Sequence, residues 1–279
     1  MNILLITILS SFLFYGCNTS NSVTSDASST KVNNSAPYYW LPSTLPRNLK
    51  TSVDFSADET TAIREMATAW ETAVDDQVNF FLTTDTTPEI SSLSMNLDSV
   101  GEDGVNGVYK ITSWPLSLST RALAVTQIFG RRFNVGASNE YVRIEHADIL
   151  VNENIYDFRT SDPGTAGSYD LRTVILHELG HFLGLGHKYG DTIMRPSIGT
   201  SFKMQAPSTS IDAPDLADRY GVTLALTPLN ALVSAPKRPL SVGPQAPGDM
   251  IKIIIELHPT GECVHKENGV IINYHLTEL

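Results

Sequence analysis

The 279-residue sequence predicts an α+β fold, in which a sheet packs with two longer helices and a short third one and is followed by a small C-terminal β appendage. Ser56 and Glu59 have capping-box spacing and precede apolar residues at helical spacing, which predicts the first helix. Residues 174–185 are apolar on most sides, as in a buried helix. Runs of β-branched and aromatic residues between turn residues predict the strands.

The helices and strands are expected in a mixed order along the chain. The first helix spans residues 57–76, the second begins after Ser168 or Asp170, and the third is capped by Asp212. A polar stretch without a clear period predicts a loop at 85–107. The expected strands are 49–55, 78–83, 109–114, 122–129, 141–151, 250–257 and 270–276.

Composition and charge restrict the class of protein. Hydrophobic residues make up 42% of the chain and charged residues 18%, which is enough apolar material for a sizeable core. The net charge of −11 argues against a nucleic-acid partner, because binding phosphates requires a basic stripe. Two cysteines, Cys17 and Cys263, are too few for a disulfide-rich scaffold or a cysteine-rich zinc module.

The amino-terminal segment has the pattern of an export signal. Residues 3–15 form an apolar run that is shorter than the ~20 residues a membrane-spanning helix needs. Gly16 and Cys17 follow, which resembles the bacterial lipoprotein signal, in which the cysteine is lipidated and becomes the new N-terminus. We therefore expect an extracytoplasmic protein, held at the cell envelope or outer membrane only by a lipid anchor on Cys17. Plain secretion and an uncleaved segment are the alternatives, and palmitate labelling of a Cys17→Ser chain would contradict lipidation.

One motif carries the chemistry. The pattern H-E-x-x-H-x-x-G-x-x-H is matched at every specified position, by His177, Glu178, His181, Gly184 and His187. Average residue frequencies give such a match by chance in roughly one chain of this length in 10⁵. The motif is therefore a strong signal, whereas H-E-x-x-H alone would be a weak one.

The spacing of the motif predicts a metal site. Four residues advance a helix by about one turn, so that His177 and His181 project from one face and can bind the same ion. In an unbroken helix His187 would point away, and Gly184 and Gly186 give the backbone the freedom to turn back. We therefore expect one catalytic Zn²⁺ held by the three histidines.

The glutamate of the motif is the expected general base. Three neutral imidazoles around zinc leave a fourth position for water, and Glu178 can reach that water rather than the metal. Buried polar groups without partners cost about 1–3 kcal/mol each, and a shared ion satisfies this cluster. Two alternatives are core histidines that bond to the backbone and a structural zinc site without catalysis.

The segment after the motif contains Ile193, Met194 and Pro196. Together with the motif it resembles the metzincin metallopeptidases, and among them most the matrixin branch. The resemblance implies a metzincin-like zincin fold, with a twisted, mostly parallel sheet and an active-site helix. It also implies hydrolysis of internal peptide bonds of a protein or peptide substrate, with Glu178 as the base and Met194 in a tight turn beneath the zinc. We expect a monomer.

Weaker likeness extends the resemblance over residues 37–221, which we assign to the catalytic domain. The expected flanking segments are a signal peptide at 1–16, a disordered tether at 17–36, a proline-rich linker at 222–248 and the β appendage at 249–279. A weak candidate for calcium is an acidic loop without EF-hand spacing, with Asp98, Glu102 and Asp103. A weak candidate for a second metal is in the tail, with His258, Cys263 and His265, where a solvated appendage is the preferred interpretation.

By analogy with the family, an extended substrate adds as a strand to an exposed sheet edge, and residues 122–126 are the expected edge. Two other functions stay open. The first is a non-catalytic surface lipoprotein that uses a zincin fold to bind a partner. The second is a zinc-dependent hydrolase of non-peptide bonds.

Overall fold

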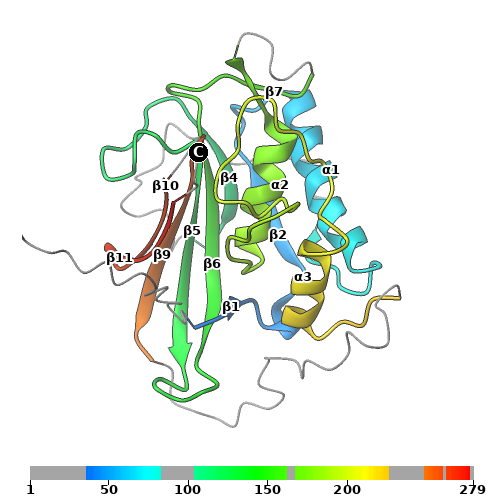
Figure 1. The fold of residues 1–279 in the computed structure, drawn as a ribbon, viewed down its shortest axis with the longest axis vertical. Helices are drawn as coiled ribbons and strands as arrows, with labels where there is room; N and C mark the ends of the chain where they lie inside the picture. Colours follow the sequence, from blue (N-terminus) through cyan, green and yellow to red (C-terminus); the bar gives the residue numbers. More distant parts are fainter. Residues whose placement is uncertain (1–35, 83–103, 162–166, 226–247, 260–261, 277–279) are drawn as a thin grey trace, which may run out of the picture. The chain divides into compact units, whose positions relative to one another are not determined.

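A computed structural model describes residues 36–82, 104–161, 167–225, 248–259 and 262–276 (Figure 1). Cys17, the expected signal peptide and the acidic residues considered for calcium lie outside the described residues. Within the described part of the chain, no helix is both long and apolar enough to cross a bilayer.

Nine strands of the described chain form one sheet, in the order β11-β10-β9-β5-β6-β4-β2-β3, with β1 beside β6. These strands are β1 (Tyr38–Tyr39), β2 (Arg47–Thr51), β3 (Phe81–Leu82), β4 (Asn106–Ile111), β5 (Ala124–Phe133), β6 (Tyr141–Asn152), β9 (Met250–Leu257), β10 (Glu262–Glu267) and β11 (Val270–Leu276). A separate pair consists of β7 (Phe158–Arg159) and β8 (Tyr169–Asp170), and η1 (Pro42–Thr44) is a short 3₁₀ turn.

The strands from residues 37–221 are mostly parallel, as expected. β2 runs parallel to β3 and β4, and β6 runs parallel to β4 and β1. β5 is the exception and runs antiparallel to β6, from Ala124 opposite Val151 to Phe133 opposite Tyr141. The α+β class with a mostly parallel sheet in this region is therefore confirmed.

Three helices lie on the same side of the sheet in Figure 1: α1 (Ala57–Ala73), α2 (Leu171–Phe182) and α3 (Asp212–Tyr220). The capping box of α1 forms as predicted, since Ser56 Oγ accepts from the Glu59 amide and the Glu59 carboxylate accepts from the Ser56 amide. α1 ends at Ala73 rather than at residue 76, because Asp75 and Asp76 adopt positive φ angles and leave the helix.

The start of α3 differs from the prediction. Ile211 is the N-cap residue and makes no side-chain capping bond, whereas Asp212 is the first helical residue. The Asp212 carboxylate, expected as the cap, bonds elsewhere because the turn after the histidine motif offers it buried donors. Gly221 ends α3 in the left-handed conformation, with a φ of 67°.

Two buried indoles hold α2, one from the neighbouring helix α1 and one at the C-terminal end of α2. Trp70 of α1 donates from Nε1 to the Leu176 carbonyl at 2.8 Å. Trp40 donates from Nε1 to the Phe182 carbonyl at 2.9 Å. Both tryptophans are fully buried, so these bonds form in the core and hold α2 in position against α1 and against the segment that follows β1.

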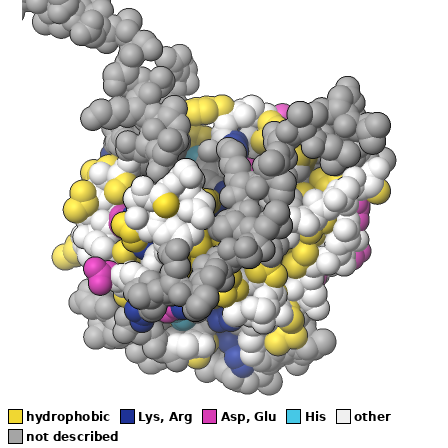
Figure 2. Space-filling view, turned by 90° about the horizontal axis from the view of Figure 1, so that it is seen from below, with side chains coloured by type: hydrophobic (Ala, Val, Ile, Leu, Met, Phe, Trp, Pro, Cys, Tyr) yellow, Lys and Arg dark blue, Asp and Glu magenta, His cyan; other side chains and the backbone are white. Residues whose placement is uncertain are grey.

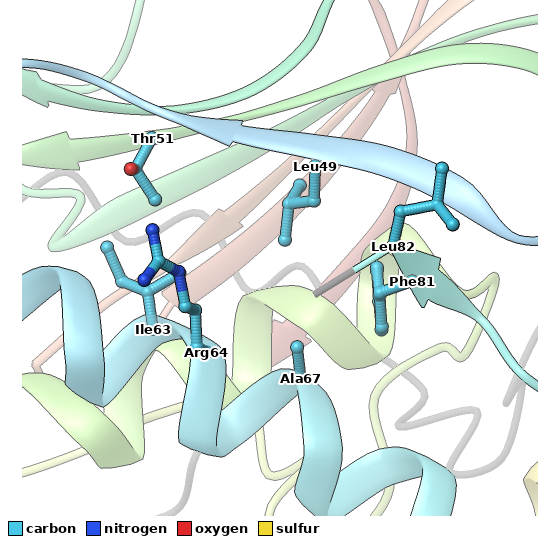
Figure 3. A pocket seen from close by; sticks show the side chains of 7 residues that line it. All are labelled: Leu49, Thr51, Ile63, Arg64, Ala67, Phe81 and Leu82. Carbon is cyan, nitrogen blue, oxygen red and sulfur yellow. The ribbon is translucent and has the colours of Figure 1, made fainter. Parts of the chain in front are cut away.

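A small hollow lies between α1 and the β2–β3 end of the sheet (Figure 3). Its lining consists of Leu49, Thr51, Ile63, Arg64, Ala67, Phe81 and Leu82. None of these residues belongs to the histidine motif, so this hollow is not the candidate site.

The C-terminal strands do not form a separate sheet. β9 pairs antiparallel with β5, from Ala124 opposite Leu257 to Arg131 opposite Met250. β10, which the sequence did not predict as a strand, pairs with β9 and β11. β5 is consequently paired on both sides, and the exposed edge expected at 122–126 is wrong for this structure.

Basic side chains near the C-terminal strands are neutralised locally. Arg132 of β5 pairs with Glu140 and Glu267, and Arg143 of β6 pairs with Glu145. On the described surface seen in Figure 2, Lys and Arg appear as separate spots.

Candidate metal centre

The helix α2 places the first two histidines of the motif. The Asp170 carboxylate caps it by accepting from the Arg172 amide at 3.3 Å, which decides between the two predicted caps. His177 and His181 are one turn apart on α2, and both are fully buried.

The chain turns back directly after α2. Gly184 has a φ of 93°, and the amides of Gly184 and Leu185 bond to the carbonyls of His181 and Gly180, which is the Schellman arrangement. A Cβ on Gly184 would clash with the Tyr38 carbonyl, so both the conformation and the space require glycine. Gly186 does not adopt a positive φ, so the freedom predicted there is not used.

The turn brings His187 to the other two histidines. Its Nε2 atom lies 3.2 Å from Nε2 of His177 and 3.0 Å from Nε2 of His181. Two nitrogens bound to a tetrahedral zinc at ~2.0–2.1 Å lie about 3.3–3.4 Å apart, close to these separations. Within the described residues, this is the one group of three or more His, Cys, Asp or Glu side chains placed to hold a metal ion.

The hydrogen bonds of the rings support the fit to a cation. Nδ1 of His177 bonds to the Ile193 carbonyl at 2.7 Å, and Nδ1 of His181 bonds to the Leu185 carbonyl at 2.8 Å. A carbonyl only accepts, so each Nδ1 carries the proton and each Nε2 presents a lone pair in the neutral ring. Lone pairs that converge on one point repel unless a cation or a proton lies between them. The nitrogen donor set suits zinc.

Glu178 lies on α2 beside the triad and is fully buried. Thr126 of β5 donates from its hydroxyl to Oε2 at 2.5 Å. Oε1 has no hydrogen-bond partner among the described residues. Burial raises the pKa of Glu178 from 4.5 to about 8, although the bond from Thr126 lowers it. The site thus contains a carboxyl group with a raised proton affinity. One of its oxygens, Oε1, is available to a further donor.

The metal-free protein should lose stability as the pH rises because of Glu178. Its pKa is about 8 in the folded chain and about 4.5 when exposed, so that the folded state binds the extra proton between these values. Stability therefore falls with rising pH across this window. We expect Glu178→Gln to remove this loss, on the order of a few kcal/mol, in urea unfolding of metal-free protein between pH 5 and 8.

The comparison with Glu178→Gln also cancels the opposite effect of His177. Burial lowers the pKa of His177 from 6.5 to about 4. The contribution of the neutral His177 ring to stability is therefore lost as the pH falls from 6.5 to about 4. Both proteins share this contribution. A stability difference between them that stays constant from pH 5 to 8 would contradict the burial of an ionisable Glu178.

The turn after the motif packs Met194 against α2. Met194 is fully buried, and a Cβ on Gly180 would clash with its sulfur. The buried Asp212 carboxylate accepts from the Thr192 hydroxyl and, at 2.9 Å, from the Ile193 amide. Asp212 therefore fixes the turn, a role that the predicted capping function did not include.

A histidine from the C-terminal strands also reaches the site. Nε2 of His265 in β10 lies 2.9 Å from Nδ1 of His187. When His187 directs its Nε2 lone pair at an ion, its Nδ1–H donates to His265, which orients the ring. The prediction of a solvated appendage is wrong for His265. This residue is buried and contacts His187, which lies 78 residues earlier in the sequence. His258 instead bonds to Glu256, and the Cys263 side chain lies outside the described part.

The comparison with protein families decides the class. Residues 42–221 match the Peptidase_M10 family, described as Matrixin, and this segment is more than half of the chain. The chain belongs to the matrixin family. The match includes the complete motif and Met194 of this matrixin, whereas β9, β10 and β11 lie beyond it.

Family membership establishes the coarse function. Matrixins are zinc metallopeptidases, so this matrixin is a metallopeptidase at the family level, and its His177, His181 and His187 are compatible with zinc. A search of curated proteins gives no match to this matrixin.

Proposed function

We propose that this matrixin is a zinc-dependent endopeptidase that hydrolyses internal peptide bonds with Glu178 as general base. One observation carries the proposal. The Nε2 atoms of His177 and His181 each lie within 3.2 Å of Nε2 of His187, next to a buried carboxylate. Export and a lipid anchor at Cys17 belong to the proposal on the sequence pattern alone.

The proposed chemistry divides between the metal and the chain. Zinc held by the three histidines would supply a Lewis acid that lowers the pKa of water and polarises a carbonyl oxygen. Glu178 would take the proton of the attacking water on Oε1 and pass it to the leaving amine. Thr126 holds Oε2 and so fixes the carboxylate in one orientation. The carbonyls of Ile193 and Leu185 keep two ligand rings in the tautomer that binds metal.

Digestion of casein and of a peptide library by the purified full-length chain tests the proposal. We expect cleavage at internal bonds, loss of cleavage with a chelator, and recovery when zinc is added back. A zinc-loaded, folded chain that binds peptides without cutting them would favour the non-catalytic lipoprotein. Turnover of ester or amide substrates other than peptides would favour a zinc-dependent hydrolase of non-peptide bonds.

A further inference from the structure

The C-terminal strands lie on the part of the sheet where a peptide substrate would bind. β5 carries Thr126, which contacts the proposed general base Glu178. Every residue of β9 pairs with a residue of β5. Ile255 of β9 is directly opposite Thr126. An extended peptide that adds to this edge of β5 would need the same backbone donors and acceptors that β9 already occupies.

The end of β9 also contacts the other side of the site. The Leu123 amide donates to the Leu257 carbonyl at 2.7 Å, and the Ile198 amide donates to the His258 carbonyl at 3.0 Å. Residues 257–258 therefore bridge the sheet and the segment that follows the Met194 turn. Ser197 forms a parallel bridge with His258, which continues this contact.

The packing of β9 is that of a core strand. Ile251, Ile253, Ile255 and Leu257 alternate toward the main hydrophobic core and are at most 4% exposed. On the next strand, His265 holds His187. Glu178, His177 and His181 are each 0% exposed in this arrangement.

We propose that the C-terminal hairpin, defined as β9 and β10 with the described residues 250–259 and 262–267, is an internal inhibitory segment that occupies the substrate-binding edge of β5. His265 fastens it to the metal centre through His187. The hairpin must leave β5 before a peptide binds, and the native chain works only through the fraction of molecules in which it has done so. This inference rests on the proposed peptidase function, because that function identifies the edge as the substrate site.

The test compares two matched substitutions in the full-length chain. Ile255→Asp places a charge at the buried contact with β5, whereas Ile271→Asp places the same charge on β11, where residue 271 is 58% exposed. The first readout is binding of a fluorescent synthetic peptide of residues 249–259, measured by anisotropy. The second readout is cleavage of casein with zinc in excess, because release of the hairpin also withdraws His265 from His187.

We expect Ile255→Asp to bind the peptide and to cleave casein at least ~10-fold better than the native chain, because apparent affinity scales with the fraction of chains whose edge is free. Unlabelled 249–259 peptide should inhibit this cleavage, and a scrambled peptide should not. Ile271→Asp should match the native chain. Ile255→Ala, which only leaves a cavity, should show a smaller rise in the same direction.

Hydrogen exchange of the α2 amides and bound zinc show whether each variant is folded. A folded, zinc-loaded Ile255→Asp or Ile255→Ala chain that binds the peptide no better than the native chain would overturn the inference. If peptide binding rises but neither chain cleaves any peptide bond, the hairpin still covers the edge, and the proposed peptidase function is what fails.

Discussion

Glu178→Gln is expected to lower kcat for peptide hydrolysis by about 10²–10⁴-fold while zinc content stays the same, because a positioned general base contributes an effect of this size. The substitution keeps the size and the Thr126 contact of the side chain but removes its proton affinity. Glu178 is not among the three residues that converge on the metal position, so the variant should bind one zinc per chain. Initial rates and zinc content are measured on the same preparation, in the native chain and in the Ile255→Asp background.

Glu65→Gln is the matched control for this loss. Glu65 lies on α1, its side chain is half exposed, and it pairs with Arg172 at the start of α2. The same change in charge should therefore leave kcat within experimental error of the native value. A Glu178→Gln chain that keeps full activity would show that Glu178 is not the base.

Zinc removal is expected to abolish activity and to lower the melting temperature substantially. A ligand at 1,000 times its Kd stabilises the folded state by about 4 kcal/mol, which for a domain of this size corresponds to a shift of roughly 8–16 °C. The reason lies in the converging lone pairs of the triad and the raised pKa of the buried Glu178 beside it, both of which a cation would compensate. Calorimetry with and without chelator measures the shift, and added zinc should reverse it.

Two variants separate a specific zinc effect from a general effect of the chelator. His181→Ala removes a ligand, so its melting temperature should no longer respond to chelator or zinc. His146→Gln changes a buried histidine that bonds to Asp148 and lies outside the triad, so the response should persist even if the protein is less stable. A chelator shift of equal size in His181→Ala would contradict metal binding at the triad.

The local parts of the site could be predicted from the sequence because their geometry depends on near neighbours. The turn between His177 and His181 follows from helix geometry, and Gly184 marks the reversal that brings back His187. Ser56 and Glu59 likewise fix the start of α1 within four residues. In each case the groups that interact are close in the sequence, so their spacing specifies their contact.

The contacts made by the C-terminal hairpin could not be predicted in the same way. The β-branched run at 250–257 correctly predicted a strand, but such a run does not specify which strand is its neighbour. β9 pairs with β5 across a long stretch of sequence, and His265 meets His187 only as a result of that pairing. The position of Asp212 before a helix predicts a cap. The donors that Asp212 binds instead, near Thr192, lie on a separate turn, and local spacing does not specify this contact.

X-ray absorption at the zinc edge of the full-length, zinc-loaded protein tests the central claim most directly. We predict one zinc per chain, with three histidine nitrogens at ~2.0–2.1 Å and no sulfur ligand, and loss of one nitrogen in His187→Ala. A zinc coordinated by sulfur, or a first shell that is unchanged in both His181→Ala and His187→Ala, would show that the three imidazoles do not hold the ion.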